Sequence, residues 1–383
     1  MSNNKSITFK KGFTIILVGM SFFMFGQNQT QQQIQSVFDQ LITAYGSAKS
    51  APELLIIADK PKQISPAKYY SSPKPIIKVD AYLFTVCRTF GKDSLNALSI
   101  VLSHELAHYY SDHTFCSDYA YAIKDKNKSL VPALKNASLN EKIGKETEAD
   151  QKGFFYAAAA GFYPFELQAE LIDKIYSAYQ LPENLPGYPT KQQRKVIAKN
   201  AEEKAQELYA YFKAGLKAME EKRYDDAITA FEMANSFIPF RENYNNIGVA
   251  RVRKALGLRL PDDIEKQFPL RFTYPIEIDN KSRLLNDRNR DLDDNEEEVK
   301  ALLKSAQKDF EKSISLDANY TKGYINLACV FDLLDNPNAA IGKIKELSKD
   351  KQNTNEAKRI LAIAYFHNKQ IEEADSIWNE LKM

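Results

Sequence analysis

The chain has 383 residues, of which 44% are hydrophobic and 27% are charged. This composition excludes a collagen-like or low-complexity chain and is too apolar for disorder throughout. The length suggests two or three domains, each large enough for its own core. The formal net charge is +2, and removing the three lysines of residues 1–26, which hold no acid, leaves the remainder at −1. A near-neutral body gives no electrostatic reason to expect nucleic-acid binding.

Residues 1–26 have the pattern of a secretory signal peptide. Lys10 and Lys11 precede an apolar run that ends at Gly26, where the chain turns polar. The run is short for a membrane span, which needs about 20 residues. We therefore expect cleavage near Gly26 and an exported, periplasmic protein with no further membrane span. Met24 is larger than the residue usual at its position before a cut, so an uncleaved inner-membrane anchor is the alternative.

The three cysteines, Cys87, Cys116 and Cys329, are too few for a disulfide scaffold. Export would permit one bridge, and Cys87 and Cys116 are the pair expected to share a domain. Buried free thiols are the alternative.

The first part of the chain is predicted to be helical, with a few short strands. Apolar residues recur at helical spacing over 30–50, whereas the proline-rich stretch 51–75 predicts short strands and loops. Residues 76–84 are rich in β-forming residues and alternate in polarity over part of their length, which predicts a strand.

The helices expected next carry the residues of chemical interest. One should begin at Asp93 or Ser94, either of which is a good N-cap, and run to about Tyr110. Two more are expected over about 140–160 and 165–180.

From about residue 203 the sequence repeats. Three alanines lie 34 residues apart, and each is followed four residues later by a large apolar side chain: Ala306 with Phe310, Ala340 with Ile344, and Ala374 with Trp378. Small residues where helices cross and a large one beside them, at this period, indicate tetratricopeptide repeats.

One repeat is interrupted. The step from Ala227 to Ala306 is 45 residues longer than one period, which predicts an insertion over 257–298 between helices near 242–256 and 299–316. We expect this insertion to leave the solenoid and to contribute little to stability. Its Phe272, Tyr274 and Ile276 would form a strand that contacts the first domain or a client.

His104-Glu105-Leu106-Ala107-His108 is the sharpest chemical signal. On a helix, residues four apart share a face, so both imidazoles can bind one metal ion while Glu105 lies beside its open position. One Zn²⁺ ion held by three protein ligands activates water, and Glu105 would act as the catalytic base.

The third ligand does not follow the metzincin pattern, which needs Gly at 111 and His or Asp at 114. Ser111 and Thr114 stand there, and His113 is one residue out of register. The better candidate is Glu146, because it shares a helical face with Asp150 and with small residues that allow close packing. Asp150 would orient a ligand imidazole. Glu148, on another face, is the alternative ligand.

These motifs resemble metallopeptidase family 48, which includes HtpX, the CaaX prenyl endopeptidases and the beta-barrel-assembly-enhancing protease. The matches are an H-E-x-x-H helix, a later E-x-x-x-D helix and the turn at 160–164, within a resemblance that covers about 60–200. The resemblance implies a zinc endopeptidase, and the last of these relatives also joins an exported peptidase domain to C-terminal repeats.

The stretch 189–194 resembles the family's later H-P-x-x-x-x-R element, with Tyr188 in place of the usual His. Tyr188 could donate a hydrogen bond to an oxyanion, or be an ordinary loop residue. Arg194 would be a structural or substrate-orienting cation.

The sequence therefore predicts a mainly α protein: a gluzincin-type zinc peptidase domain with a small β-sheet over 27–202, and an α-solenoid of tetratricopeptide repeats over 203–383. The expected function is zinc-dependent hydrolysis of protein or peptide substrates, with an extended peptide paired to the strand near 76–84 and the repeats recruiting a protein partner. The alternative is a repeat-based chaperone or scaffold with a structural or inactive zinc site.

Overall fold

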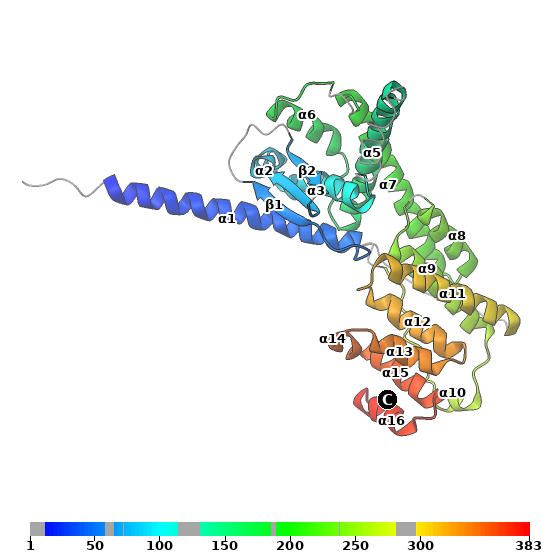
Figure 1. Ribbon diagram of the computed structural model, residues 1–383. Helices are drawn as coiled ribbons and strands as arrows, with labels where there is room; N and C mark the ends of the chain where they lie inside the picture. The colour runs from blue at the N-terminus through cyan, green and yellow to red at the C-terminus, as the bar shows by residue number, and fades with distance from the viewer. Residues whose placement is uncertain are drawn as a thin grey trace, which may run out of the picture. The chain divides into compact units, whose positions relative to one another are not determined.

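The computed structural model describes residues 12–57, 65–71, 73–113, 131–184, 189–236, 238–280 and 296–383. Over these residues the chain is mainly α-helical with a small three-stranded sheet (Figure 1). It divides into two compact units. One comprises residues 1–45 and 51–202, and the other comprises 46–50 and 203–383.

Helix α1 (Gly12–Tyr45) opens the first unit and passes the expected cleavage position near Gly26 without a break. Its C-terminal half is anchored in the core by Ile34, Val37 and Leu41, which are buried. Tyr45 ends the helix and donates a hydrogen bond to the carbonyl of Ser103 at 2.7 Å. Among the described residues, none of the helices combines the length and apolarity that a membrane crossing requires.

The sheet has the order β1-β3-β2. Strand β1 (Glu53–Ile57) pairs parallel to β3 (Ile76–Asp80), and β2 (Ala67–Tyr70) pairs antiparallel to β3 on the other side. Since β3 is flanked on both sides, it has no open edge for a peptide. The expectation that substrate pairs with this strand is therefore wrong, and the strand edge beside α3 belongs to β2.

The strand expected over 76–84 ends at Asp80, because Asp80 caps helix α2 (Ala81–Arg88) and its carboxylate accepts the N–H of Tyr82 at 2.9 Å. Leu83 and Cys87 are therefore buried helix residues. Cys116 lies outside the described residues, so its pairing with Cys87 stays a prediction.

Helix α3 (Ser94–Tyr110), preceded by the short helix η1 (Gly91–Asp93), runs through the centre of this unit. Asp93 occupies the N-cap position, but its carboxylate accepts from the Asn96 side chain rather than from a backbone N–H. Helix α3 packs on α1, on the sheet and on α5 (Val131–Ala159), with α6 (Gln168–Ala178) beside them. Long α7 (Lys191–Glu220) follows.

The second unit is a succession of helices that pack on their neighbours in chain order (Figure 1). They are α8 (Tyr224–Asn235), α9 (Arg241–Leu258), α10 (Asp263–Gln267), α11 (Glu296–Leu316), α12 (Thr321–Leu333), α13 (Pro337–Lys345), α14 (Lys349–Gln352), α15 (Asn355–His367) and α16 (Ile371–Glu380).

The repeated pattern of small and large residues sits where these helices cross. Ala306, Ala340 and Ala374 are fully buried, and the large side chain that follows each one is buried as well. A Cβ on Gly248 would come within 2.7 Å of the Phe310 ring, so the glycine makes room for the aromatic side chain.

Helices α9 and α11, on either side of the insertion, pack against each other. The described part of the insertion does not leave the helices, however, and this corrects the expected excursion. Phe272 is buried against Phe366 and Trp378, at ring-centroid distances of 5.1 and 5.5 Å. Residues 273–280 form neither strand nor helix, so the expected strand is also absent from the described part. The long-range apolar contact of Phe272 overrides the local β pattern.

Candidate metal centre

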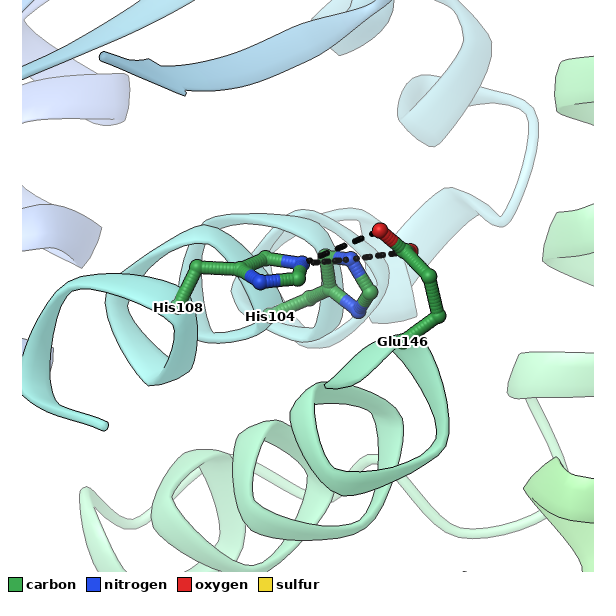
Figure 2. A group of neighbouring side chains, drawn as sticks. All are labelled: His104, His108 and Glu146. Atoms are coloured by element: carbon green, nitrogen blue, oxygen red, sulfur yellow. Dashed lines mark hydrogen bonds and ion pairs between the residues drawn. The ribbon is translucent and has the colours of Figure 1, made fainter. Parts of the chain in front are cut away.

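Helix α3 presents His104 and His108 on one face, one turn apart. Buried Leu98, Leu102 and Leu106 fix the helix against the core, so the rotation of the helix determines where the imidazoles point. The two Nε2 atoms lie 3.1 Å apart. Figure 2 shows both rings projecting from α3 toward Glu146, which comes from α5.

Gly153 allows α5 to approach α3 closely, so that Glu146 can reach the imidazoles. A Cβ on Gly153 would lie 2.8 Å from both the Cα and the N of His104, closer than real Cβ contacts, so the two helices touch here backbone to backbone. Glu146 lies two turns before Gly153 on the same face of α5, and its carboxylate consequently reaches the imidazoles of α3.

The three side chains together have the geometry of a metal site. Glu146 Oε2 lies 3.4 Å from His104 Nε2, and Oε1 lies 3.5 Å from His108 Nε2. In a tetrahedral zinc site, bonds of about 2.0–2.2 Å place neighbouring ligand atoms roughly 3.3–3.5 Å apart. His104, His108 and Glu146 could hold a metal ion. Both carboxylate–imidazole separations match this range, and the Nε2–Nε2 separation of 3.1 Å is slightly shorter.

The charges around the site also fit a cation. His104 Nδ1 lies 2.8 Å from the carboxylate of Asp150, which is 2% exposed. Burial opposes protonation of His104, but Asp150 and Glu146 raise its pKa to about 10. Burial raises the pKa of Glu146, yet its contacts with His104 and His108 hold it well below its usual range. The carboxylates of Glu146 and Asp150, next to these imidazoles, therefore favour a positive charge at the site.

Arg194 supports Asp150 from α7. Its Nη2 donates to Asp150 Oδ1 at 2.7 Å and its Nε donates to Oδ2 at 3.3 Å. Two parallel hydrogen bonds hold the carboxylate in a fixed orientation toward His104. Although burial alone would lower the pKa of Arg194, Asp150 raises it. The structure thus places Arg194 behind the metal ligands, whereas Tyr188 lies outside the described residues.

The second imidazole has a partner that the motif did not reveal. Helix α3 ends in a Schellman motif, in which Asp112 takes a positive φ of 54° and the N–H of His113 bonds the carbonyl of His108 at 3.1 Å. This turn brings His113 Nδ1 to 2.8 Å from His108 Nδ1. Because burial and the neighbouring His108 lower its pKa to about 4, His113 is neutral and can accept the His108 Nδ1–H.

Glu148 takes part in this arrangement and not in the ligand group. Its carboxylate lies 3.4 Å from His113 Nε2 and pairs with Lys152 at 2.5 Å. The sequence does contain a signal for His113. It lies five residues after His108 and just beyond the end of the helix, which is the C″ position of a Schellman motif. That signal is recognisable only if Asp112 is known to adopt a left-handed conformation.

Glu105 reaches the sheet. Its side chain is largely buried, and its Oε2 accepts a hydrogen bond from the backbone N–H of Tyr69 at 2.7 Å. Tyr69 lies on β2, an edge strand in the described sheet. The acid of the H-E-x-x-H motif is therefore held at the edge of β2, and it follows His104 in the chain.

A comparison of this chain with known protein-family models and with curated proteins found no match.

Proposed function

We propose that this chain is a zinc-dependent metalloendopeptidase of the gluzincin type, exported to the periplasm, whose second unit is a tetratricopeptide solenoid that binds client proteins. The observation that carries the proposal is the convergence of His104, His108 and Glu146 at separations close to those around a tetrahedral ion. The resemblance to metallopeptidase family 48, which rests on the same residues, agrees with this proposal.

The site residues have distinct roles in this proposal. His104, His108 and Glu146 would hold the ion, which when bound supplies the Lewis acidity that activates water and polarises a carbonyl. Glu105 would accept the proton of the attacking water on a carboxylate oxygen and return it to the leaving amine. Asp150 and His113 would fix the orientation of the two imidazoles by contacts to their Nδ1 atoms.

The edge of β2 is the surface that an extended substrate would use. The Tyr69 N–H points from this strand to Glu105, so a peptide added along that edge would pass beside the acid and the metal ligands. A site that served only to hold structural zinc would have no need of an acid at this place, and this favours catalysis over the scaffold alternative.

The test is proteolysis by the purified protein with stoichiometric zinc, with casein as substrate. Wild type should cleave it, whereas Glu105→Gln should keep its zinc and its circular dichroism spectrum and lose cleavage by at least a hundredfold. Equal cleavage by both proteins would rule out the mechanism. Zinc binding by both proteins without any cleavage would favour the structural role.

A further inference from the structure

Residues 272–279, here named the strap, cross the helices of the second unit without forming helix or strand themselves. The helices of this unit pack as pairs, among them α9 with α11, α12 with α13, and α15 with α16. The strap contacts the first helix of each of these three pairs. Phe272 stacks on His367 of α15 at 5.7 Å, Tyr274 donates to Asp332 of α12 at 2.8 Å, and Asp279 pairs with Asn246 of α9. The strap thus runs from α15 back to α9, against the order of the helices.

Asparagine side chains hold the strap by its backbone. Asn246 accepts the N–H of Asp279 at 2.7 Å and donates to its carbonyl at 2.9 Å. Asn326 does the same with Glu277, at 3.0 and 2.9 Å. Glu277 and Asp279, which lie two residues apart, thus each have the backbone N–H and C=O paired, as they would beside a neighbouring β-strand.

A third amide completes this asparagine clamp. Asn245 donates to the carbonyl of Glu277 at 3.1 Å and accepts from Asn326 at 2.9 Å. All three asparagines, Asn245, Asn246 and Asn326, are fully buried. A buried amide without hydrogen-bond partners is destabilising, so the clamp requires an extended backbone in front of it.

Side chains of the strap add a pattern to this backbone contact. Tyr274, Ile276 and Ile278 are partly buried against the helices, and the carboxylate of Asp279 accepts a hydrogen bond from Tyr320 at 2.7 Å. Lys322 donates to the carbonyl of Ile278 at 3.2 Å. The surface made by the clamp and these contacts, here named the groove, therefore fits a chain with an aromatic residue, two aliphatic residues at alternate positions and an acid that follows them. The chain turns after Tyr274, where the Ile276 N–H bonds the Tyr274 carbonyl at 2.9 Å.

We infer that this groove is a binding site for extended protein segments, that the strap occupies it in cis, and that a partner segment with the same pattern must displace the strap to bind. The clamp holds the main chain of its occupant, and the surrounding contacts select the side-chain pattern, so a second peptide with that pattern fits as the strap does. This inference rests on the proposed protein-binding role of the repeats but not on the metal centre, and its test involves no proteolysis.

The test measures binding of a fluorescein-labelled peptide of residues 271–280 to the full chain by fluorescence anisotropy. A strap-released variant (Tyr274→Ser, Ile276→Ser and Ile278→Ser) should bind the peptide at least tenfold more tightly than wild type. Adding Asn246→Ala and Asn326→Ala to the released variant should abolish this binding, and a scrambled peptide should not bind.

Two results would overturn the inference: a folded released variant that binds the peptide no better than the scrambled one, or wild type that binds as tightly as the released variant. If the released variant fails to fold, hydrogen exchange on wild type decides. The Asp279 amide should exchange at least tenfold faster than the buried amides of α9 and α12, because the strap opens locally. Equal rates would show that the strap opens only with the whole unit, which would also overturn the inference.

Discussion

The carboxylate of Glu105 accepts a hydrogen bond from the backbone N–H of Tyr69, 2.7 Å away on the edge strand β2. Under the proposed mechanism, a peptide pairing with β2 would engage this edge of the strand and compete for the same N–H. The carboxylate would then be released to take a proton from water. Substrate alignment and the availability of the acid are thereby linked through one backbone group.

The close approach of α5 to α3 predicts a strong effect of Gly153→Ala. The added Cβ would meet the backbone of His104 at 2.8 Å, so the helices must separate and Glu146 must withdraw from the imidazoles. We expect zinc affinity to fall at least tenfold and stability to fall by about 1–3 kcal/mol, measured by competition with a chelator and by urea unfolding.

Gly144→Ala on the same helix is the matched control. A Cβ there meets nothing within 4 Å, so zinc affinity should be unchanged and stability should rise by up to about 1 kcal/mol. Similar zinc loss in both variants would mean that helix content, and not helix approach, controls the site.

His113→Ala should weaken zinc binding about 10- to 100-fold, because the contact that fixes the tautomer of His108 is lost. The same chelator competition measures this. His367→Ala is the control, because His367 lies on α15 and pairs with Asp332. An unchanged zinc affinity in His113→Ala would show that His113 does not support His108 in metal binding.

The stability of the second unit should depend on pH through Glu242. Burial raises the pKa of this carboxyl to about 7, against the effect of neighbouring Arg241. The folded chain therefore binds more protons than the unfolded chain between pH of about 4.5 and 7. Its stability should fall as pH rises through that window, by up to about 1.4 kcal/mol per unit.

Glu242→Gln should flatten this dependence and raise the melting temperature at pH 8, with little change at pH 4. Melting curves across this range test it, with exposed Glu232→Gln on α8 as the control. A wild-type slope that persists in Glu242→Gln would assign the pH dependence to another group.

Phe272→Ala should destabilise the protein by about 3–5 kcal/mol, because a large side chain packed on Phe366 and Trp378 is removed. Leu270→Ala, two residues away and 72% exposed, should change stability by less than about 0.5 kcal/mol. Equal losses of stability in the two variants, measured by urea unfolding, would show that the insertion is a dispensable excursion from the helices.

The sequence predicted what depends on local spacing. The i, i+4 pair of His104 and His108 and the shared face of Glu146 and Asp150 follow from helical geometry alone. The end of the strand at Asp80 was missed, because alternation continues through Ala81 and Leu83 while the capping carboxylate of Asp80 starts a helix. The alternating polarity favours a strand beyond Asp80, but the N-cap at Asp80 starts a helix there instead.

Long-range packing was beyond the reach of the sequence. Phe272 and Tyr274 read as an alternating strand, yet their partners are Trp378 and Asp332, about a hundred and nearly sixty residues away along the chain. The asparagines that hold the strap have no spacing signal, since Asn246 and Asn326 lie on different helices. Such contacts follow from the stacking of helices and not from any motif.

The most direct test of the metal centre is the zinc content of purified Glu146→Gln and Glu148→Gln, measured by atomic emission alongside wild type. Glu146 lies within ligand distance of both imidazoles, whereas Glu148 pairs with Lys152 and His113. We expect about one zinc ion per chain in wild type and in Glu148→Gln, and loss of most zinc in Glu146→Gln. Full zinc content in Glu146→Gln together with zinc loss in Glu148→Gln would contradict it.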